Sequence, residues 1–213
     1  GAEFSRSVEN IYAETIALVK NGAKELTLLG QNVSSYEPNV IKDGIRKKIK
    51  LGDLCQILSN IEGLERIRYL TSHPIDIDEN LIDQHKNNPK LMPFLHLPIQ
   101  SGSDRILKRM NRKHSKTFYL NLIEKIKKIN KSVAFSSDFI VGYPGETDND
   151  FQESLEVIEK VRYASSYSFK YSPRPGTPSS LKDGLIDSDV VDMRLKKMQS
   201  ILNKHQTEFN LSF

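Results

Sequence analysis

Apolar positions along the chain follow two spacings, one typical of strands and one typical of helices. Short continuous apolar runs, which favour buried strands, occur near residues 26–29, 66–71, 94–99, 133–141 and 164–171. Helical spacing follows at about 51–61, 81–82, 103–110, 116–129, 148–161 and 188–209. This alternation predicts an α/β fold with a parallel sheet, right-handed crossovers and strands buried on both faces.

The chain opens on a helix rather than on a strand. Ser7 is the expected N-cap of this helix, and Gly22 ends it. A parallel α/β domain usually opens on a strand, so we expect a first strand upstream of Gly1. Without that strand, residues 26–29 would leave a leucine-rich parallel edge exposed, and we expect the isolated chain to aggregate or to be marginally stable.

Each predicted strand ends in a polar or glycine-rich turn, at residues 30–32, 72–74, 100–103, 142–146 and 172–178. Any single turn can be explained by the ordinary preference of turns for Gly, Pro, Ser and Asn. All five together favour a ligand-binding rim at the carboxyl ends of the strands of a β/α barrel. The turn at 142–146 is the most informative, because glycines allow close ligand approach and a helix N-terminus follows.

Composition places the chain among ordinary globular proteins of one domain, with 213 residues, 38% of them hydrophobic and 27% charged. No apolar run approaches the roughly 20 residues that a membrane span needs, and the N-terminus has no signal-like segment, so we expect a cytoplasmic protein. The single cysteine, Cys55, excludes an internal disulfide framework and fits a reducing compartment. Its place on the apolar face of a helix predicts a packing role.

Charge and isolated polar residues leave alternatives open. The net charge of +4 permits an anionic partner without requiring one. Basic stretches at 42–50 and 108–116 are either phosphate contacts or solvated faces. His73, before a proline, is either a ligand or base or simply a strand-ending residue. Glu146 either binds a cofactor or favours the helix dipole. The absence of a G-x-x-x-x-G-K-S/T loop argues against an unrelated phosphate-binding enzyme.

Five segments together resemble the central domain of the radical-SAM methylthiotransferases, and most closely the tRNA-modifying branch of that family. They occur in the family's order as TLLGQNVSSY (27–36), RIRYLTSHP (66–74), HLPIQSGSDRILKRMNR (96–112), SSDFIVGYPGET (136–147) and YSPRPGTP (171–178). The resemblance covers almost the whole chain. It implies an α/β partial (β/α) barrel of the radical-SAM type with parallel strands, lacking its first strand. Residues 1–178 would form the radical-SAM core, and 179–213 a helix leading toward an absent RNA-binding TRAM domain.

The resemblance also implies a chemistry. In the family, a C-x3-C-x2-C loop after the first strand holds a 4Fe–4S cluster that binds S-adenosylmethionine. Reductive cleavage gives a 5′-deoxyadenosyl radical, which abstracts hydrogen from C2 of N(6)-isopentenyladenosine beside the anticodon before a methylthio group is added. The implied partners are the tRNA anticodon stem-loop and an electron-donor protein, and the complete protein is expected to be a monomer away from membranes. This sequence has none of the cluster cysteines, so we expect this chain alone to be inactive.

Individual roles carry over only at positions that match the family's motifs. Residues implied to bind S-adenosylmethionine are Gly30, Gln31 and Asn32 at its methionine part, Gln100 and Ser101 near its ribose, and Ser137, Asp138, Ile140, Val141 and Gly142 along the ligand. Residues implied to border the substrate are Arg174 and Thr177, and we add His73 to them. No residue is assigned as catalytic, and none as a metal ligand.

Two other interpretations stay open. One is a fragment from the related branch that methylthiolates an aspartate of a ribosomal protein, although residues 31–32 and 172–178 favour the tRNA branch. The other is a non-catalytic half-barrel that serves as an RNA-binding or interaction module. Such a module would keep the basic stretches but would not need the combination of Gln31, Gln100 and Asp138.

Overall fold

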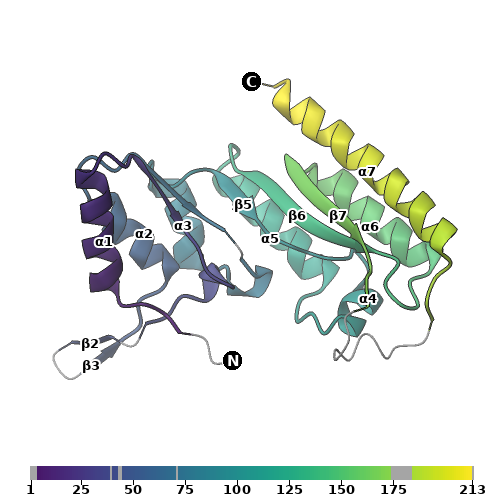
Figure 1. The fold of residues 1–213 in the computed structure, drawn as a ribbon, viewed down its shortest axis with the longest axis horizontal. Helices are drawn as coiled ribbons and strands as arrows, with labels where there is room; N and C mark the ends of the chain where they lie inside the picture. The colour runs from purple at the N-terminus through teal and green to yellow at the C-terminus, as the bar shows by residue number, and fades with distance from the viewer. Residues whose placement is uncertain (1–3, 39, 43–44, 71, 174–183, 213) are drawn as a thin grey trace. The chain divides into compact units, whose positions relative to one another are not determined.

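The structure is a computed structural model that describes residues 4–38, 40–42, 45–70, 72–173 and 184–212. The chain forms two compact units (Figure 1). The N-terminal unit comprises Gly1–His96 and Ile126–Val133, and the C-terminal unit comprises Leu97–Lys125 and Ala134–Phe213. Each unit is described by itself.

The N-terminal unit is built on a two-stranded parallel sheet. Strand β1 (Glu25–Leu28) pairs with β4 (Arg66–Tyr69), with Leu26 opposite Ile67. Its helices are α1 (Val8–Lys20), α2 (Leu51–Ser59) and α3 (Glu79–Asn87), with 3-10 turns η1 (Val33–Ser35) and η2 (Pro74–Asp76), and β5 (Phe94–His96) follows. The Ser7 hydroxyl accepts the Asn10 N–H, which confirms the predicted N-cap of α1.

A short hairpin lies within residues 31–50, a polar segment whose composition by itself predicts a loop. Strands β2 (Val40–Lys42) and β3 (Ile45–Lys47) pair antiparallel, with Ile41 opposite Arg46. Each strand has three residues and carries basic residues, so neither shows the alternation that predicts a strand. The prediction of a loop was therefore wrong for these six residues.

Apolar residues of α2, β4 and α3 form the core of the N-terminal unit. Its fully buried side chains include Leu51, Leu54, Leu58, Ile67, Leu81 and Ile82. Cys55 lies among them with no exposed surface, and burial raises the pKa of its thiol to about 12. The packing role predicted for Cys55 is confirmed, because a buried thiol with a raised pKa is neither a nucleophile nor a metal ligand.

The C-terminal unit is built on strands β6 (Ala134–Val141) and β7 (Ser165–Lys170), which pair in parallel. Its helices are α4 (Asp104–Arg109), the first part of α5 (Lys116–Ile129), α6 (Asp148–Val161) and α7 (Ser188–Asn210), and Figure 1 shows α7 running beside β7. Phe139, Tyr119 and Tyr163 fill the space between the sheet and its helices. The Tyr119 hydroxyl lies 3.0 Å from that of Tyr163 and donates to Leu97 O.

Strands β1 and β7 differ from the prediction that every strand is buried on both faces. In β1 and β7 no residue is fully buried, whereas β6 buries Phe135, Ser137, Phe139 and Val141 against the helices. The prediction was wrong for β1 and β7. A parallel strand is buried on both faces only where other elements cover both of them, and residues of β1 and β7 stay partly exposed. Among the described residues β1 pairs only with β4, and Leu29 beyond it is 73% exposed. No helix in the described part of the chain is long and apolar enough to cross a membrane.

Candidate functional site

The turn after β6 is held by a buried ion pair. Gly142 has a φ of +76°, and its N–H donates to the Glu146 carboxylate at 3.0 Å. The same carboxylate accepts a hydrogen bond from Arg194 of α7 at 2.9 Å. A Cβ at position 142 would lie 2.6 Å from Val191, so glycine is needed both for the backbone and for the approach of α7.

Glu146 therefore has a structural task that neither sequence interpretation included. Burial raises the pKa of its carboxyl, while the Gly142 N–H and Arg194 act in the opposite direction. Arg194 also donates to the Glu146 carbonyl oxygen and to Asp148, and it lies over the Phe151 ring. No local sequence signal indicates Arg194, because it is one basic residue on a long amphipathic helix 48 positions away.

Helix α6 begins where the sequence predicted, at a capping box. The Thr147 hydroxyl accepts the Asp150 N–H, and the Asp150 carboxylate accepts the Thr147 N–H. Arg105 and the Ser103 hydroxyl also donate to Asp150. Burial alone would raise the pKa of Asp150, but the hydrogen bonds from Arg105, Ser103 and Thr147 outweigh it and hold the pKa below its ordinary value. These bonds fix the helix N-terminus against the 101–105 segment.

A β-bulge positions Gln100 beside β6. The Leu97 N–H donates to Ser136 O, but the Gln100 N–H donates to Asp138 O, so three steps on one side match two on the other. Gln100 has a φ of +74°, in the left-handed region that favours glycine. Such bulges and strained residues gather at functional sites, where the surrounding contacts hold them. The sequence placed Gln100 at a strand end but gave no indication of the bulge.

Both predicted cofactor-binding serines have hydroxyls that are already bonded within the C-terminal unit. Ser137 is fully buried, donates to Leu97 O and accepts the Ile99 N–H. Ser101 is fully buried and accepts the Ser103 N–H. Together with the hydrogen bond from the Gly102 N–H to the Ser154 hydroxyl of α6, these bonds hold segment 97–103 against β6 and α6.

Asp138 and Ile140 lie on the face of β6 opposite to Ser137, Phe139 and Val141. The strand alternates, so Ser137, Phe139 and Val141 point to the helices while Asp138 and Ile140, both half-buried, point to the other face. Arg112 lies close enough to Asp138 for their charges to interact. Burial lowers the pKa of the Arg112 guanidinium, and the Asp138 carboxylate acts in the opposite direction.

In the N-terminal unit, a second polar cluster joins the ends of β1 and β4. The Asn32 side chain donates to Asp76 at 2.6 Å and accepts from the Ser34 hydroxyl and the His73 N–H. The His73 ring accepts the Ile75 N–H at 3.4 Å, so His73 caps the turn η2. The predicted residues Asn32 and His73 are thus brought together, through the backbone of His73. The neighbouring Ser72 hydroxyl is buried and makes no hydrogen bond with a described residue.

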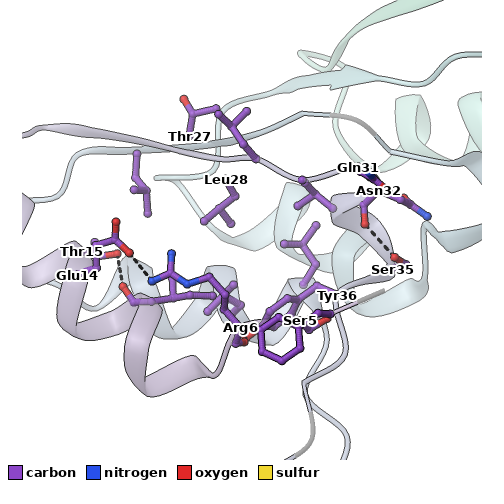
Figure 2. A pocket seen from close by; sticks show the side chains of 18 of the residues that line it. Ser5, Arg6, Glu14, Thr15, Thr27, Leu28, Gln31, Asn32, Ser35 and Tyr36 are labelled. Carbon is purple, nitrogen blue, oxygen red and sulfur yellow. Dashed lines mark hydrogen bonds and ion pairs between the residues drawn. The ribbon is translucent and has the colours of Figure 1, made fainter. Parts of the chain in front are cut away.

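A cavity of about 550 Å³ lies along β1 in the same unit (Figure 2). Its walls come from α1, β1 and α2, and the predicted residues Gly30, Gln31 and Asn32 line one part of it. Figure 2 shows Gln31 and Asn32 away from the ion pair of Arg6 and Glu14. The cavity follows the side of β1 that has no partner strand in the described part of the chain.

The predicted site residues therefore fall into two sets, one in each unit. Gly30, Gln31, Asn32 and His73 belong to the N-terminal unit, and Gln100, Ser101, Ser137, Asp138, Ile140, Val141 and Gly142 belong to the C-terminal unit. Arg174 and Thr177 lie outside the described residues.

The sequence matches the model of a known protein family. Residues 1–158 match the Radical SAM superfamily. The chain belongs to the radical SAM superfamily.

Curated relatives match the whole length of this radical SAM chain. The protein called tRNA-2-methylthio-N(6)-dimethylallyladenosine synthase from Rickettsia typhi is 50% identical over 212 residues, which are 100% of this chain and 47% of the relative. Proteins of the same name from Neorickettsia sennetsu and Bartonella tribocorum are 52% and 53% identical over 99% and 98% of this chain and 44% and 45% of theirs. The chain thus spans about half the length of the relatives it matches.

Solved structures share the radical SAM fold at low sequence identity. The radical S-adenosylmethionine methyltransferase TsrM from Kitasatospora setae, with cobalamin and a 4Fe–4S cluster bound, has a TM-score of 0.61 at 11% identity, over 83% of this chain and 33% of that one. The cobalamin-dependent radical enzyme OxsB, with aqua-cobalamin and S-adenosylmethionine bound, has a TM-score of 0.56 at 13% identity, over 93% and 27%. These likenesses support the predicted partial radical-SAM barrel with parallel strands.

The residues of this radical SAM chain fit one of the two implied cofactors. A 4Fe–4S cluster needs several thiolates, and the sequence has one cysteine, which is buried with a raised pKa. No group of three or more His, Cys, Asp or Glu residues in the described ranges could hold a metal ion. S-adenosylmethionine carries an ammonium, a carboxylate and ribose hydroxyls. Gln100, Asp138 and Arg112 carry amide, carboxylate and guanidinium groups, and Asp138 lies beside both others, through a backbone hydrogen bond with Gln100 and a charge interaction with Arg112. The donor set fits S-adenosylmethionine but not the cluster.

Proposed function

We propose that the full-length protein containing this chain is a tRNA methylthiotransferase. It would use S-adenosylmethionine to add a methylthio group at C2 of N(6)-isopentenyladenosine beside the anticodon. The observation that carries this proposal is the identity of about 50% to tRNA-2-methylthio-N(6)-dimethylallyladenosine synthases along the entire chain. The proposed partners are the tRNA anticodon stem-loop and an electron-donor protein, and the proposed functional form is a cytoplasmic monomer.

The proposed part of this chain is to bind S-adenosylmethionine and to exclude water from it. Gln100, fixed by the bulge, and the backbone from Ile140 to Gly142 would hold the adenosine portion. For Gly30, Gln31 and Asn32 the family resemblance implies a role toward the methionine portion, and within the N-terminal unit Asn32 is fixed by Asp76 and Ser34. When bound, S-adenosylmethionine supplies the radical and methyl chemistry, while the protein contributes binding, orientation and electrostatics.

The domain arrangement is part of the same proposal. Residues 1–178 would be the radical-SAM core, and 179–213 would lead to an RNA-binding domain. Helix α7 (Ser188–Asn210) packs on the core through Arg194 and through the ion pair of Lys170 with Asp192, so it would hold its direction relative to the core. His73, Arg174 and Thr177 are proposed to border the substrate.

The test is nucleoside analysis of tRNA from a bacterial strain that lacks its own methylthiotransferase. Mass spectrometry of digested tRNA should show the 2-methylthio nucleoside when the full-length protein is expressed. Expression of residues 1–213 alone should leave only the unmodified isopentenyladenosine. A full-length protein that instead methylthiolates a ribosomal-protein aspartate, or neither substrate, would refute the proposal.

A further inference from the structure

Strand β7 exposes two aromatic rings on one face. Tyr167 and Phe169 are two residues apart, so their side chains point to the same side of the sheet. The register places Tyr167 opposite Asp138 and Phe169 opposite Ile140, on the face away from the helices. The two residues are 58% and 55% exposed. Their backbones pair with β6, but neither side chain makes a ring contact or hydrogen bond with any residue in the described part of the chain.

The distribution of side chains on β7 is the reverse of an ordinary amphipathic strand. On the face toward the helices it carries Ser168, opposite Phe139, and Lys170, which forms an ion pair with Asp192 of α7. On the open face it carries the two large aromatic residues. A strand that serves only the core would place its aromatic side chains toward the core and its polar ones outward. The reversal indicates that the open face is built to contact something other than the unit's own core.

The charges beside the rings define what kind of partner fits. Asp138 lies opposite Tyr167, and the half-buried Arg112 lies close to Asp138. Lys108 and Lys113, near Arg112 in the sequence, are exposed and form no ion pair with a described residue. An apolar surface with the Arg112 cation beside Asp138, and with these two lysines within four residues of Arg112 in the sequence, suits a flat ring joined to a phosphate chain. Single-stranded RNA is bound in this way, by stacking of bases on aromatic side chains and by pairing of phosphates with cations.

We propose that Tyr167 and Phe169 form a stacking platform for one unstacked nucleobase of the RNA substrate, with Lys108 and Lys113 contacting the adjoining phosphates. This inference rests on the proposed function, because it takes the ligand of the platform to be the RNA that the same site modifies. An apolar side chain of another protein segment could also pack on the two rings, but such a segment gives no role to the neighbouring cations.

The experiment compares two synthetic anticodon stem-loops with the full-length protein. One carries adenine at the nucleotide that follows the anticodon, and the other carries an abasic ribose there. Fluorescence anisotropy should show that the adenine loop binds about 10-fold or more tightly than the abasic loop. Tyr167→Ala and Phe169→Ala should each remove most of this preference, while their affinity for the abasic loop stays that of the wild type. Tyr167→Phe and Phe169→Tyr are the matched controls, because each keeps a ring and should keep the preference.

The outcomes separate the platform from the proposed function. If the alanine variants keep the full preference for adenine, or if Tyr167→Phe loses it as completely as Tyr167→Ala, the platform is overturned, whether or not the protein methylthiolates tRNA. If the preference disappears only in the alanine variants, the platform stands, even if no methylthio nucleoside is formed. Lys108→Ala with Lys113→Ala should weaken both loops equally and reduce the salt dependence of binding. An unchanged salt dependence would overturn the phosphate contacts.

Discussion

Tyr69 and His85 form a hydrogen-bonded pair inside the N-terminal unit. The Tyr69 hydroxyl lies 2.7 Å from Nε2 of His85, and the rings are tilted at 56° to each other. Burial lowers the pKa of His85 to about 4, so the imidazole stays neutral at physiological pH. Burial also raises the pKa of the Tyr69 hydroxyl, and Cys55 nearby adds to that shift. All three groups are therefore uncharged in the folded protein near pH 7.

The pair makes the stability of the chain depend on pH in a specific direction. The unfolded chain protonates His85 near pH 6.5, whereas the folded chain resists protonation down to about pH 4. The stability is therefore full above pH 6.5 and falls as the pH drops toward 4, by about 2 kcal/mol at pH 5 from this residue. Urea unfolding of the wild type and of His85→Gln at pH 7.5 and pH 5 measures the difference. Equal pH dependence in the two proteins would contradict the assignment.

At the scale of secondary-structure elements, the contact between α7 and the turn after β6 depends on one buried ion pair. Arg194 of α7 and Glu146 have side chains only 6% and 1% exposed. Gly142 adds its N–H to Glu146, and its lack of a side chain gives Val191 of α7 room to pack. Gly102 has a comparable role, because a Cβ there would collide with the backbone of α6 at Glu153. These contacts hold the turn after β6 against α7 and the turn at Gly102 against α6.

Removing one partner of the Arg194–Glu146 ion pair should lower the free energy of unfolding. Arg194→Met keeps most of the side-chain volume but leaves the Glu146 carboxyl buried without its cation, which should cost about 3–5 kcal/mol of unfolding free energy. Urea unfolding followed by circular dichroism measures the loss, and adding Glu146→Gln to Arg194→Met should recover part of it. The matched control is Glu208→Gln, which breaks the exposed pair of Arg162 and Glu208 and should cost less than about 1 kcal/mol. Similar losses for Arg194→Met and the control would contradict the role of the buried pair.

At the scale of the whole molecule, the chain belongs to the radical SAM superfamily, but its sequence has a single cysteine and its described residues include no group of His, Cys, Asp or Glu that could hold an iron–sulfur cluster. Cys55 cannot substitute, because it lies in the core at the centre of α2. The N-terminal unit has a cavity along β1, and among the described residues β1 pairs with β4 alone. Binding of the cluster is therefore expected to need residues outside these 213.

Iron content tests this expectation directly. After anaerobic reconstitution, residues 1–213 should bind no stoichiometric iron, and a version extended upstream through a cysteine loop should bind about four irons with a matching absorbance band. Sulfide analysis on the same samples is the control for adventitious iron, which would come without sulfide. Four irons with matching sulfide in the 213-residue chain would show that our assessment of Cys55 is wrong.

Local sequence patterns predicted the main helices and strands in order, with most of their bounds, although they missed the β2–β3 hairpin. Helix α6 was predicted at 148–161 and observed at Asp148–Val161, because Thr147 and Asp150 form a local capping box and the apolar period is unbroken. The motifs around Gln31, Gln100 and Gly142 also identified the family before any contact was known. Local signals of this kind are complete within one turn or one strand, so no tertiary information is needed to read them.

Which polar groups serve the fold, and which remain for a ligand, depends on contacts between residues far apart in the chain. The tertiary structure bonded the hydroxyls of Ser101 and Ser137 within the unit, paired Glu146 with Arg194, and set Gln100 on a bulge. It also left Tyr167 and Phe169 on the open face of β7, where the sequence had predicted a strand buried on both sides. The physical reason is that burial and pairing depend on residues far apart in the chain, and one-dimensional spacing does not contain those distances.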